Sequence, residues 1–198
     1  MHVLSVLCHH RTDSLSHALA DRFAAGCREA GHSVEIADLH AEGFCPVWQP
    51  EDDAQFDDAP MPSDVLAEQA RIERCDAMAL IFPLWWWGMP AMLKGWVDRV
   101  WSWGWAYDQT DDPTRSLLRD RTCVMLIPAG ASPQTMAPYG YETAMDAIWR
   151  TGTLGYFGMV EKRIHILHGS GGSVARRQGH LDTAHRAGLT IGDPAVED

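Results

Sequence analysis

Residues Asp76–Leu84 read DAMALIFPL, a continuous apolar run. Runs of this kind are typical of a strand in a parallel sheet whose two faces are both covered by helices. Further short apolar runs predict strands at residues 2–8 (HVLSVLC), Ser33–Ala37, Arg121–Pro128 and Lys162–Leu167. These runs therefore predict a sheet of five parallel strands.

Helical patterns alternate with these runs. They predict helices at Ser14–Ala30, Asp64–Arg74, Pro90 to about Trp103, Thr143–Gly158 and Val174–Gly188. Strands that alternate with helices through short connections specify an α/β three-layer sandwich, and five strands fit the flavodoxin-like order 2-1-3-4-5. In such sheets ligands bind at the carboxyl ends of the strands, so we expect the chemistry in the loops after strands one, three and four.

The size and charge of the chain restrict the number of domains, the partners and the cellular location that we expect. Its 198 residues can bury one good core, so we expect a single domain at 1–198. A formal net charge of −11 without a run of Lys or Arg argues against a nucleic-acid or anionic-lipid partner. The apolar start lacks the basic residues of a secretory signal, and no segment has the ~20 apolar residues of a membrane span. We therefore expect a cytoplasmic protein with no stable membrane insertion.

Neither the cysteines nor the histidines indicate a metal site. The five cysteines include no C-x-x-C pair, so we expect reduced and mostly buried thiols. His165 and His168 are three residues apart on a predicted strand and should face opposite sides, which makes a shared metal improbable.

The segment after the first predicted strand is rich in hydroxyl groups and leads into a helix. Residues 9–16 read HHRTDSLS. Free backbone N–H groups together with Ser14, Ser16 and Arg11 could hold a phosphate. Asp13 would repel a phosphate and could cap the helix instead. Because there is no glycine-rich fingerprint, a phosphate site and an ordinary capped helix both remain open for this loop.

The segment after the third predicted strand is rich in tryptophan, since seven of the nine tryptophans lie between residues 85 and 105. The adjacent Trp85, Trp86 and Trp87 cannot all point into a core, because successive side chains of an extended segment face opposite ways. We expect some of them to line a cavity. A flat apolar wall with exposed backbone N–H groups suits an isoalloxazine ring. The alternative is a tryptophan-rich dimer interface or a corner of the core.

The string PLWWWGMPAMLKGWVDRVWSWGWAY at residues 83–107 resembles the signature of the NAD(P)H quinone reductase family of flavodoxin-like proteins. This family includes DT-diaphorase, the modulator of drug activity B proteins and the ancillary flavoproteins of Kef potassium efflux systems. The H-x-R-x-D-S-L-S loop matches the family's first phosphate loop. GYFGMVEKRIHIL resembles the segment before its last strand, so the similarity covers about residues 1–168.

The resemblance implies a tightly bound FAD or FMN and a homodimer with two active sites at its interface. It implies that NAD(P)H and the acceptor use the same place in turn. The implied cofactor-binding residues are His9, Arg11, Ser14, Leu15 and Ser16 at the flavin phosphates, and Pro83, Leu84, Trp85, Trp86 and Trp87 along the isoalloxazine. Backbone amides of the second group, rather than indoles, are the implied donors to the ring.

The third family segment is usually glycine-rich, whereas here residues 128–132 read PAGAS. Ala129 stands where one glycine is expected, and its methyl group would narrow the pocket or shift the loop. This difference would alter the flavin contacts that the resemblance implies for Ala129 and Gly130.

Two tyrosines are the candidate catalytic residues. In DT-diaphorase a tyrosine and a histidine beyond the third segment assist charge transfer to the quinone. Here residues 139–142 read YGYE, without a histidine. We hypothesise that Tyr139 or Tyr141 faces the substrate, where it stabilises the reduced flavin or donates to the acceptor oxygen. The alternative is that both tyrosines pack at the dimer edge.

The leading functional hypothesis is a flavin-dependent NAD(P)H oxidoreductase that transfers hydride to a quinone or similar small acceptor. An ancillary regulatory flavoprotein that binds a membrane transporter, with weak reductase activity, is the alternative. A one-electron flavodoxin carrier is disfavoured, because flavodoxins lack a tryptophan-lined substrate cavity. The sequence does not distinguish NADH from NADPH.

Two further segments carry weaker signals. Asp38–Ser63, with four prolines and the acidic cluster Glu51–Asp58, reads as an extended, solvated surface excursion. Its length resembles the FAD-binding branch of the family, which favours FAD over FMN. Lys94, Asp98 and Arg99 are expected to form a surface ion-pair ladder rather than a catalytic set.

Overall fold

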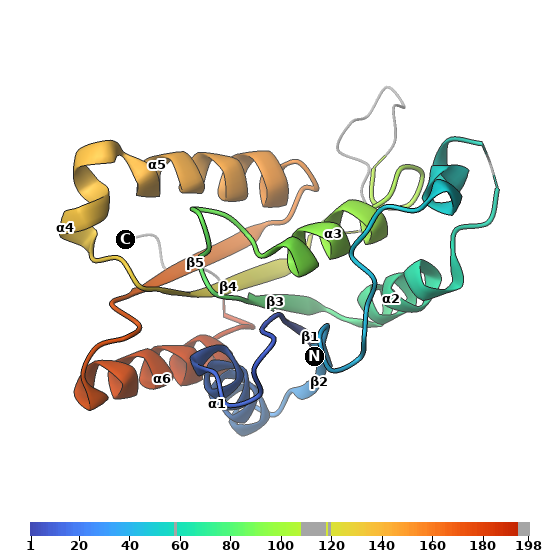
Figure 1. The fold of residues 1–198 in the computed structure, drawn as a ribbon. Helices are drawn as coiled ribbons and strands as arrows, with labels where there is room; N and C mark the ends of the chain where they lie inside the picture. Colours follow the sequence, from blue (N-terminus) through green and yellow to red (C-terminus); the bar gives the residue numbers. More distant parts are fainter. Residues whose placement is uncertain (58, 108–117, 119, 194–198) are drawn as a thin grey trace.

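A parallel sheet forms the centre of the structure. The computed structural model describes residues 1–57, 59–107, 118 and 120–193, and Figure 1 shows the sheet between helices. Five strands pair in the order β2-β1-β3-β4-β5, all parallel. They are β1 (His2–Leu7), β2 (Ser33–Asp38), β3 (Ala77–Ile81), β4 (Thr122–Ala129) and β5 (Glu161–His168). The predicted α/β class and strand order are confirmed.

Helices cover both faces of the sheet. In Figure 1 α1 and α6 lie below it, and α3 and α5 lie above it. The bounds are α1 (Leu15–Glu29), α2 (Ser63–Arg74), α3 (Ala91–Val100), α5 (Tyr141–Asp146) and α6 (Val174–Leu189). Ala77, Ala79 and Ile81 of β3 pack in the core on the α1–α6 side. Met78 and Leu80 pack in the core on the opposite side, which explains the continuous apolar run of this strand.

The helices α1 and α6 approach each other at two glycines. A Cβ atom at Gly26 would lie 2.1 Å from the carbonyl oxygen of His185. One at Gly188 would lie 2.2 Å from the carbonyl oxygen of Phe23. The absence of side chains at these two positions therefore sets how closely the two helices pack.

Some element boundaries differ from the prediction. β3 is shorter than the predicted strand Asp76–Leu84, because Pro83 has no N–H to donate to a neighbouring strand. The predicted helix Thr143–Gly158 is instead α5 followed by the π-helix η3 (Ala147–Gly155). The short helices η1 (Pro50–Phe56), α4 (Pro133–Met136) and η2 (Ala137–Tyr139) are additional to the predicted ones.

The prediction for Arg99 was wrong. Its side chain is 2% exposed and lies beneath the segment that joins β2 to α2. Nε of Arg99 donates to Asp52 at 2.9 Å, and Nη1 donates to Asp64 at 2.7 Å. Lys94 and Asp98 do form an exposed ion pair on α3. The helix pattern could not reveal which of its charged residues another segment covers.

The acidic segment is consequently not a simple solvated loop. Asp52 is fully buried, whereas the neighbouring Glu51 and Asp53 are both exposed, and Asp58 lies outside the described residues. A Cβ atom at Gly95 of α3 would lie 2.1 Å from the carbonyl oxygen of Pro46. The segment therefore packs tightly on α3.

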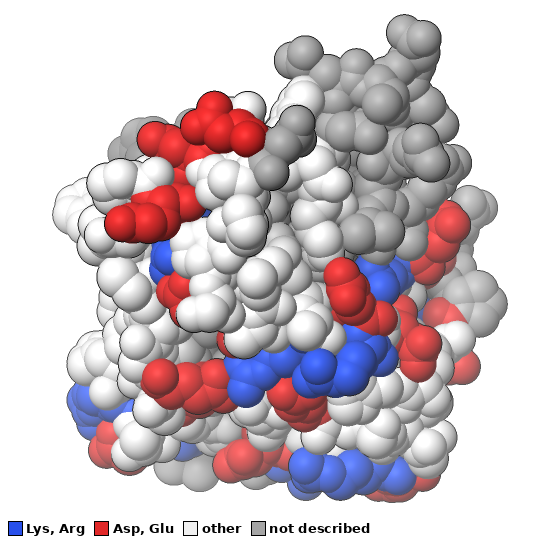
Figure 2. All heavy atoms as spheres, turned by 90° about the vertical axis from the view of Figure 1, so that its right-hand side faces the viewer, with Lys and Arg blue, Asp and Glu red and all other residues white. Residues whose placement is uncertain are grey.

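Acidic and basic side chains are interspersed on the face around α2. Figure 2 shows blue side chains lying among red ones on this face. Arg71 of α2 illustrates this, because it pairs with Glu35 at 2.9 Å and Glu68 at 2.8 Å, and also with Glu42. Across the described ranges, no helix combines the length and the apolar character needed to cross a membrane.

Four of the five cysteines are buried, as predicted, and Cys45 is exposed. Burial raises the pKa of Cys8, Cys27 and Cys75 to about 11. These buried thiols are therefore protonated at neutral pH and pack as small apolar groups.

Candidate functional site

The loops after β1, β3 and β4 meet at the carboxyl ends of their strands. The ring of Trp85, after β3, lies 6.1 Å from that of His9 and 6.0 Å from that of His10, both after β1. The N–H of Leu84 donates to the carbonyl oxygen of Pro128 at 2.9 Å, which joins the β3 loop to β4. The sequence-predicted segments are thus brought together at one edge of the sheet.

The three adjacent tryptophans form a tight turn. Trp85 and Gly88 exchange backbone hydrogen bonds of 3.3 and 3.0 Å. Trp86 and Trp87 between them have φ values of 49° and 61°. This pattern belongs to a type I′ turn, which normally has Asn and Gly at these positions. A bulky residue with positive φ costs of order 1–3 kcal/mol, and such strain concentrates at functional sites.

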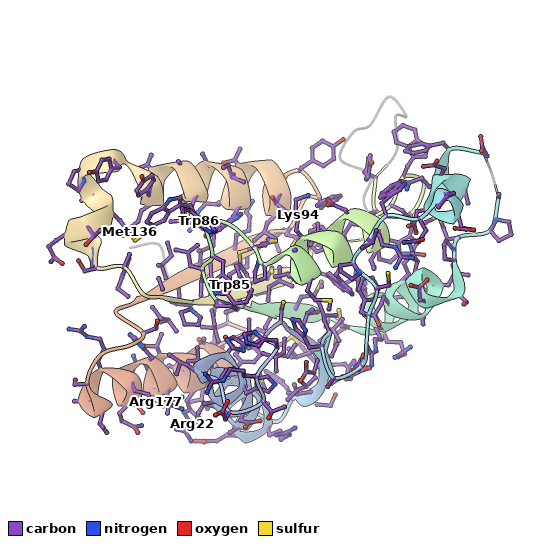
Figure 3. The ribbon with its side chains drawn as sticks, viewed as in Figure 1. Arg22, Trp85, Trp86, Lys94, Met136 and Arg177 are labelled. Atoms are coloured by element: carbon purple, nitrogen blue, oxygen red, sulfur yellow. The ribbon has the colours of Figure 1, made fainter. Side chains whose placement is uncertain are left out.

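The strained turn borders a cavity. The cavity has a volume of about 230 Å³ and is lined by Leu84, Trp86, Trp87, Gly130 and Ala131. Within the part of the chain that the structure describes, the N–H groups of Trp86, Trp87, Gly130 and Ala131 have no hydrogen-bond acceptor. Figure 3 shows Trp85 and Trp86 on the loop between β3 and α3, to the left of Lys94.

The third segment contributes to the cavity through Gly130 rather than Ala129. A Cβ atom at Gly130 would have no heavy atom within 4 Å, so this position opens onto free space. Ala129 is fully buried and is not among the lining residues. Ala129 therefore does not line the cavity. Pro83 is likewise buried behind the lining.

The β1–α1 loop ends at a capped helix. Ser14 is the N-cap of α1, and its Oγ accepts a hydrogen bond from the N–H of His17 at 3.2 Å. Ser16, in the first helical turn, is 1% exposed, and its hydroxyl has no partner among the described residues. Leu15 is partly buried and packs on the core beneath α1. The helix N-terminus thus offers two hydroxyls and free amides, a suitable setting for an anion.

Arg11 and Asp13 interact with each other. Nε and Nη2 of Arg11 donate to the Asp13 carboxylate at 3.0 and 2.9 Å. Both side chains are well exposed, at 63% and 73%. Asp13 is therefore not the helix cap, and the guanidinium of Arg11 already has a counterion.

His9 presents one nitrogen outward as a donor. Burial, together with the nearby His10 and His17, lowers its pKa below the usual value. The ring is therefore neutral at pH 7. Its Nδ1 accepts from the N–H of Arg11 at 3.1 Å, which leaves the proton on Nε2.

The two candidate tyrosines stack in series on the tryptophan turn. The rings of Trp87 and Tyr141 lie 4.0 Å apart at 18°, and those of Tyr141 and Tyr139 lie 5.3 Å apart. Tyr139 is 70% exposed. The turn at Gly140, with φ of 65°, allows both rings to lie on one side. The structure thus places Tyr141 against Trp87, a residue of the cavity lining, and Tyr139 against Tyr141.

Two polar pairs at this edge were missed by sequence reasoning. Nε2 of His17 lies 3.0 Å from a carboxylate oxygen of Asp38, and Nε2 of His168 lies 3.1 Å from one of Glu142. Asp38 ends β2 and His168 ends β5. Their position at carboxyl ends of strands was the available signal. We expected the chemistry only in the loops after strands one, three and four, whereas these two residues end strands two and five.

Comparison with known proteins identifies the family. A protein-family model described as "Flavodoxin-like fold" matches residues 1–188. The chain belongs to this flavodoxin-like family. A Haemophilus influenzae protein named uncharacterized NAD(P)H oxidoreductase is 30% identical over 146 residues, which cover 74% of this chain and 72% of that protein.

Other flavodoxin-like relatives have quinone in their names. NAD(P)H dehydrogenase [quinone] 1 of Cavia porcellus is 26% identical over 188 residues, which cover 85% of this chain and 68% of that protein. The solved structure of NAD(P)H:quinone oxidoreductase from Methanothermobacter marburgensis is 33% identical, with a TM-score of 0.89 and 99% of both chains covered. The flavodoxin-like chain described here is thus an oxidoreductase.

The site fits the flavin that this flavodoxin-like family implies. A flat ring with acceptor atoms at its edge needs an apolar wall and hydrogen-bond donors, and the lining residues include the apolar Leu84 and four residues with unpaired N–H groups. The open space at Gly130 would be filled by any larger side chain. A phosphate group needs donors at a helix N-terminus, and α1 supplies them.

Proposed function

We propose that the chain is a flavin-dependent NAD(P)H oxidoreductase that reduces quinones or similar small acceptors by two electrons. The observation that supports this most directly is the strained turn at Trp86 and Trp87, two residues with unpaired N–H groups that line the same cavity as Gly130. The names of the relatives supply the donor and acceptor classes.

A bound flavin would supply a two-electron carrier between the two substrates. Overall, NAD(P)H gives up a hydride, and the quinone gains that hydride and one proton from solvent to become a hydroquinone. The N–H groups of Trp86, Trp87, Gly130 and Ala131 would bind the acceptor edge of the ring and stabilise negative charge there. Leu84 would form its apolar wall.

In this proposal the β1–α1 loop binds the phosphate part of the cofactor. His9 Nε2–H, the hydroxyls of Ser14 and Ser16 and the amide of Leu15 are the donors, and Arg11 contributes if its pair with Asp13 opens. We propose FAD as the flavin, with FMN as the alternative. The part of the β2–α2 segment that contains Cys45 and Asp52 packs on α3 through Arg99, and this supports FAD because it extends the protein surface beyond the first loop.

We also propose a cytoplasmic homodimer. A groove of about 450 Å³ next to the tryptophan turn runs between α3 and η3 and includes Trp87, Met89, Ile148 and Tyr156. Ile148 and Tyr156 are 59% and 52% exposed, and a second copy would bury them. In that arrangement the partner would close the open side of the cavity.

Tyr139 and Tyr141 are proposed to donate to the acceptor or to stabilise the reduced cofactor. The test is steady-state oxidation of NADH and of NADPH with benzoquinone and menadione, after saturation with flavin. Replacing both tyrosines by Phe keeps the ring stack on Trp87 and removes only the hydroxyls. We expect kcat/KM for the quinone to fall by roughly 100- to 10,000-fold, the typical contribution of one positioned proton donor.

Equal kcat/KM in the wild type and the double variant would remove this role from the tyrosines. Poor turnover of the wild type with every quinone would contradict the enzyme proposal itself. If the chain then co-purified stoichiometrically with a transporter, the regulatory flavoprotein hypothesis would replace it.

A further inference from the structure

Asp38, His17 and Ser14 form a continuous chain of polar groups that ends at the N-terminus of α1. Nε2 of His17 lies 3.0 Å from Oδ2 of Asp38, and Nδ1 lies 2.8 Å from Oγ of Ser14. The other carboxylate oxygen of Asp38 accepts from the N–H groups of His40 and Ala41, at 3.2 Å each. His17 and Asp38 are largely buried, with side chains 16% and 19% exposed. The imidazole is thus held between a fixed carboxylate and a hydroxyl.

The protonation of His17 decides which way the Ser14 hydroxyl points. A carboxylate can only accept, so Nε2 of His17 carries a proton. The Oγ of Ser14 already accepts from the N–H of His17 at 3.2 Å. If Nδ1 is bare, the Ser14 hydrogen turns toward the ring. If Nδ1 is protonated, Oγ accepts a second hydrogen bond, and its hydrogen is free to point outward.

We propose that His17 and Asp38 are positioning residues that turn the Ser14 hydroxyl toward a phosphate of the bound flavin. This inference rests on the proposed function. With a proton on both ring nitrogens, the imidazole would donate on one side to Asp38 and on the other to Ser14, whose hydroxyl hydrogen would then point to the phosphate.

The charges in the loop support this role for His17. The guanidinium of Arg11 is paired with Asp13, and His9 is neutral because burial lowers its pKa. Among these groups, His17 is the one whose ring contacts the hydroxyl of the N-cap Ser14 directly, at 2.8 Å. In the same first turn of α1, the hydroxyl of Ser16 is buried and has no hydrogen-bond partner among the described residues.

A serine, a histidine and a carboxylate in series also activate nucleophiles in acyl-transfer enzymes. Here the Oγ of Ser14 is the N-cap of α1 and accepts from a backbone N–H, so it is fixed as part of the helix end. This placement suits binding of an anion better than attack on a carbonyl carbon.

The test compares flavins with and without a phosphate. The full-length chain, stripped of bound flavin, is titrated with FMN and with riboflavin, and binding is followed by flavin fluorescence. His17→Phe keeps the ring shape and removes both nitrogens. His17→Asn restores a side-chain N–H near the position of Nδ1. His40→Gln is the matched control, because it changes a histidine of the same corner but keeps the backbone bond to Asp38.

We expect the wild type to bind FMN more tightly than riboflavin. His17→Phe should weaken FMN binding by about tenfold or more, the effect of losing one charge-assisted hydrogen bond, with riboflavin affinity unchanged. His17→Asn should recover most of the FMN affinity, and His40→Gln should match the wild type. Circular dichroism and thermal melting would verify folding.

Several results would overturn the inference. An FMN preference that persists in His17→Phe, or an equal loss for both flavins, would show that His17 does not act on the phosphate. Equal affinity of the wild type for FMN and riboflavin would show that no phosphate reaches Ser14. Failure of the wild type to bind either flavin would instead refute the proposed function, and this inference with it.

Discussion

Trp86 shows how a single residue can carry backbone strain at a site. It is 95% exposed, has a φ of 49° and lines the cavity with Gly130. We predict that Trp86→Asn leaves stability unchanged or raises it by about 1 kcal/mol, because Asn tolerates positive φ and little packing is lost. Flavin or acceptor binding should weaken several-fold. A destabilised variant with unchanged flavin affinity would contradict a functional role for this turn.

Replacing Arg99 tests how much the buried ion network under the β2–α2 segment stabilises the fold. Arg99→Met leaves Asp52 buried without its partner, which should cost about 3–5 kcal/mol. The melting temperature should fall by roughly 6–20 °C for a chain of this size. Lys94→Met is the matched control on the same helix, because the Lys94–Asp98 pair is exposed and contributes at most about 1 kcal/mol. Similar melting temperatures for both variants would show that the network is not stabilising.

At the scale of elements, the contact between α1 and α6 depends on glycine. Gly26→Ala would force a methyl group to 2.1 Å from a backbone carbonyl, so the helices must separate, at a cost of about 1–3 kcal/mol or more. Gly179 of α6 has no neighbour within 4 Å, so Gly179→Ala should stabilise the helix by up to about 1 kcal/mol. Urea unfolding of the two variants measures the difference. A stabilised Gly26→Ala variant would contradict this packing.

The π-helix η3 is a second element that lies close to the site. It spans nine residues, and π-helical turns are rare and often occur at functional sites. The Thr153 hydroxyl donates to the carbonyl oxygen of Ile148 at 3.0 Å, which satisfies a group in the widened turn. The helix lines the groove beside Trp87, where we propose that the second copy packs.

For the whole molecule, the sheet and the meeting of three loops could be predicted from the sequence. Apolar runs such as Asp76–Leu84 report burial on both faces directly, and parallel strands place their carboxyl ends at one edge. The burial of Arg99 could not be predicted, because it depends on a segment about fifty residues earlier that folds over α3. The His17–Asp38 pair likewise depends on the register of neighbouring strands, and the positive φ of Trp86 depends on the tight turn.

The central claim is that the chain binds a flavin in the cavity between the tryptophan turn and Gly130. The most direct measurement is the absorbance spectrum of the purified, undialysed protein, with mass spectrometry of the molecule that heat releases. The measurement includes two variants. Gly130→Leu should fill the cavity, and Gly179→Leu is its control because it changes an exposed position of α6.

We predict the two visible bands of an oxidised flavin, near about 375 and 450 nm, and release of FAD or FMN from the wild type and from Gly179→Leu. Gly130→Leu should be colourless but folded. A colourless wild type that takes up neither flavin would contradict the claim, and a Gly130→Leu variant with a full complement of flavin would place the cofactor elsewhere.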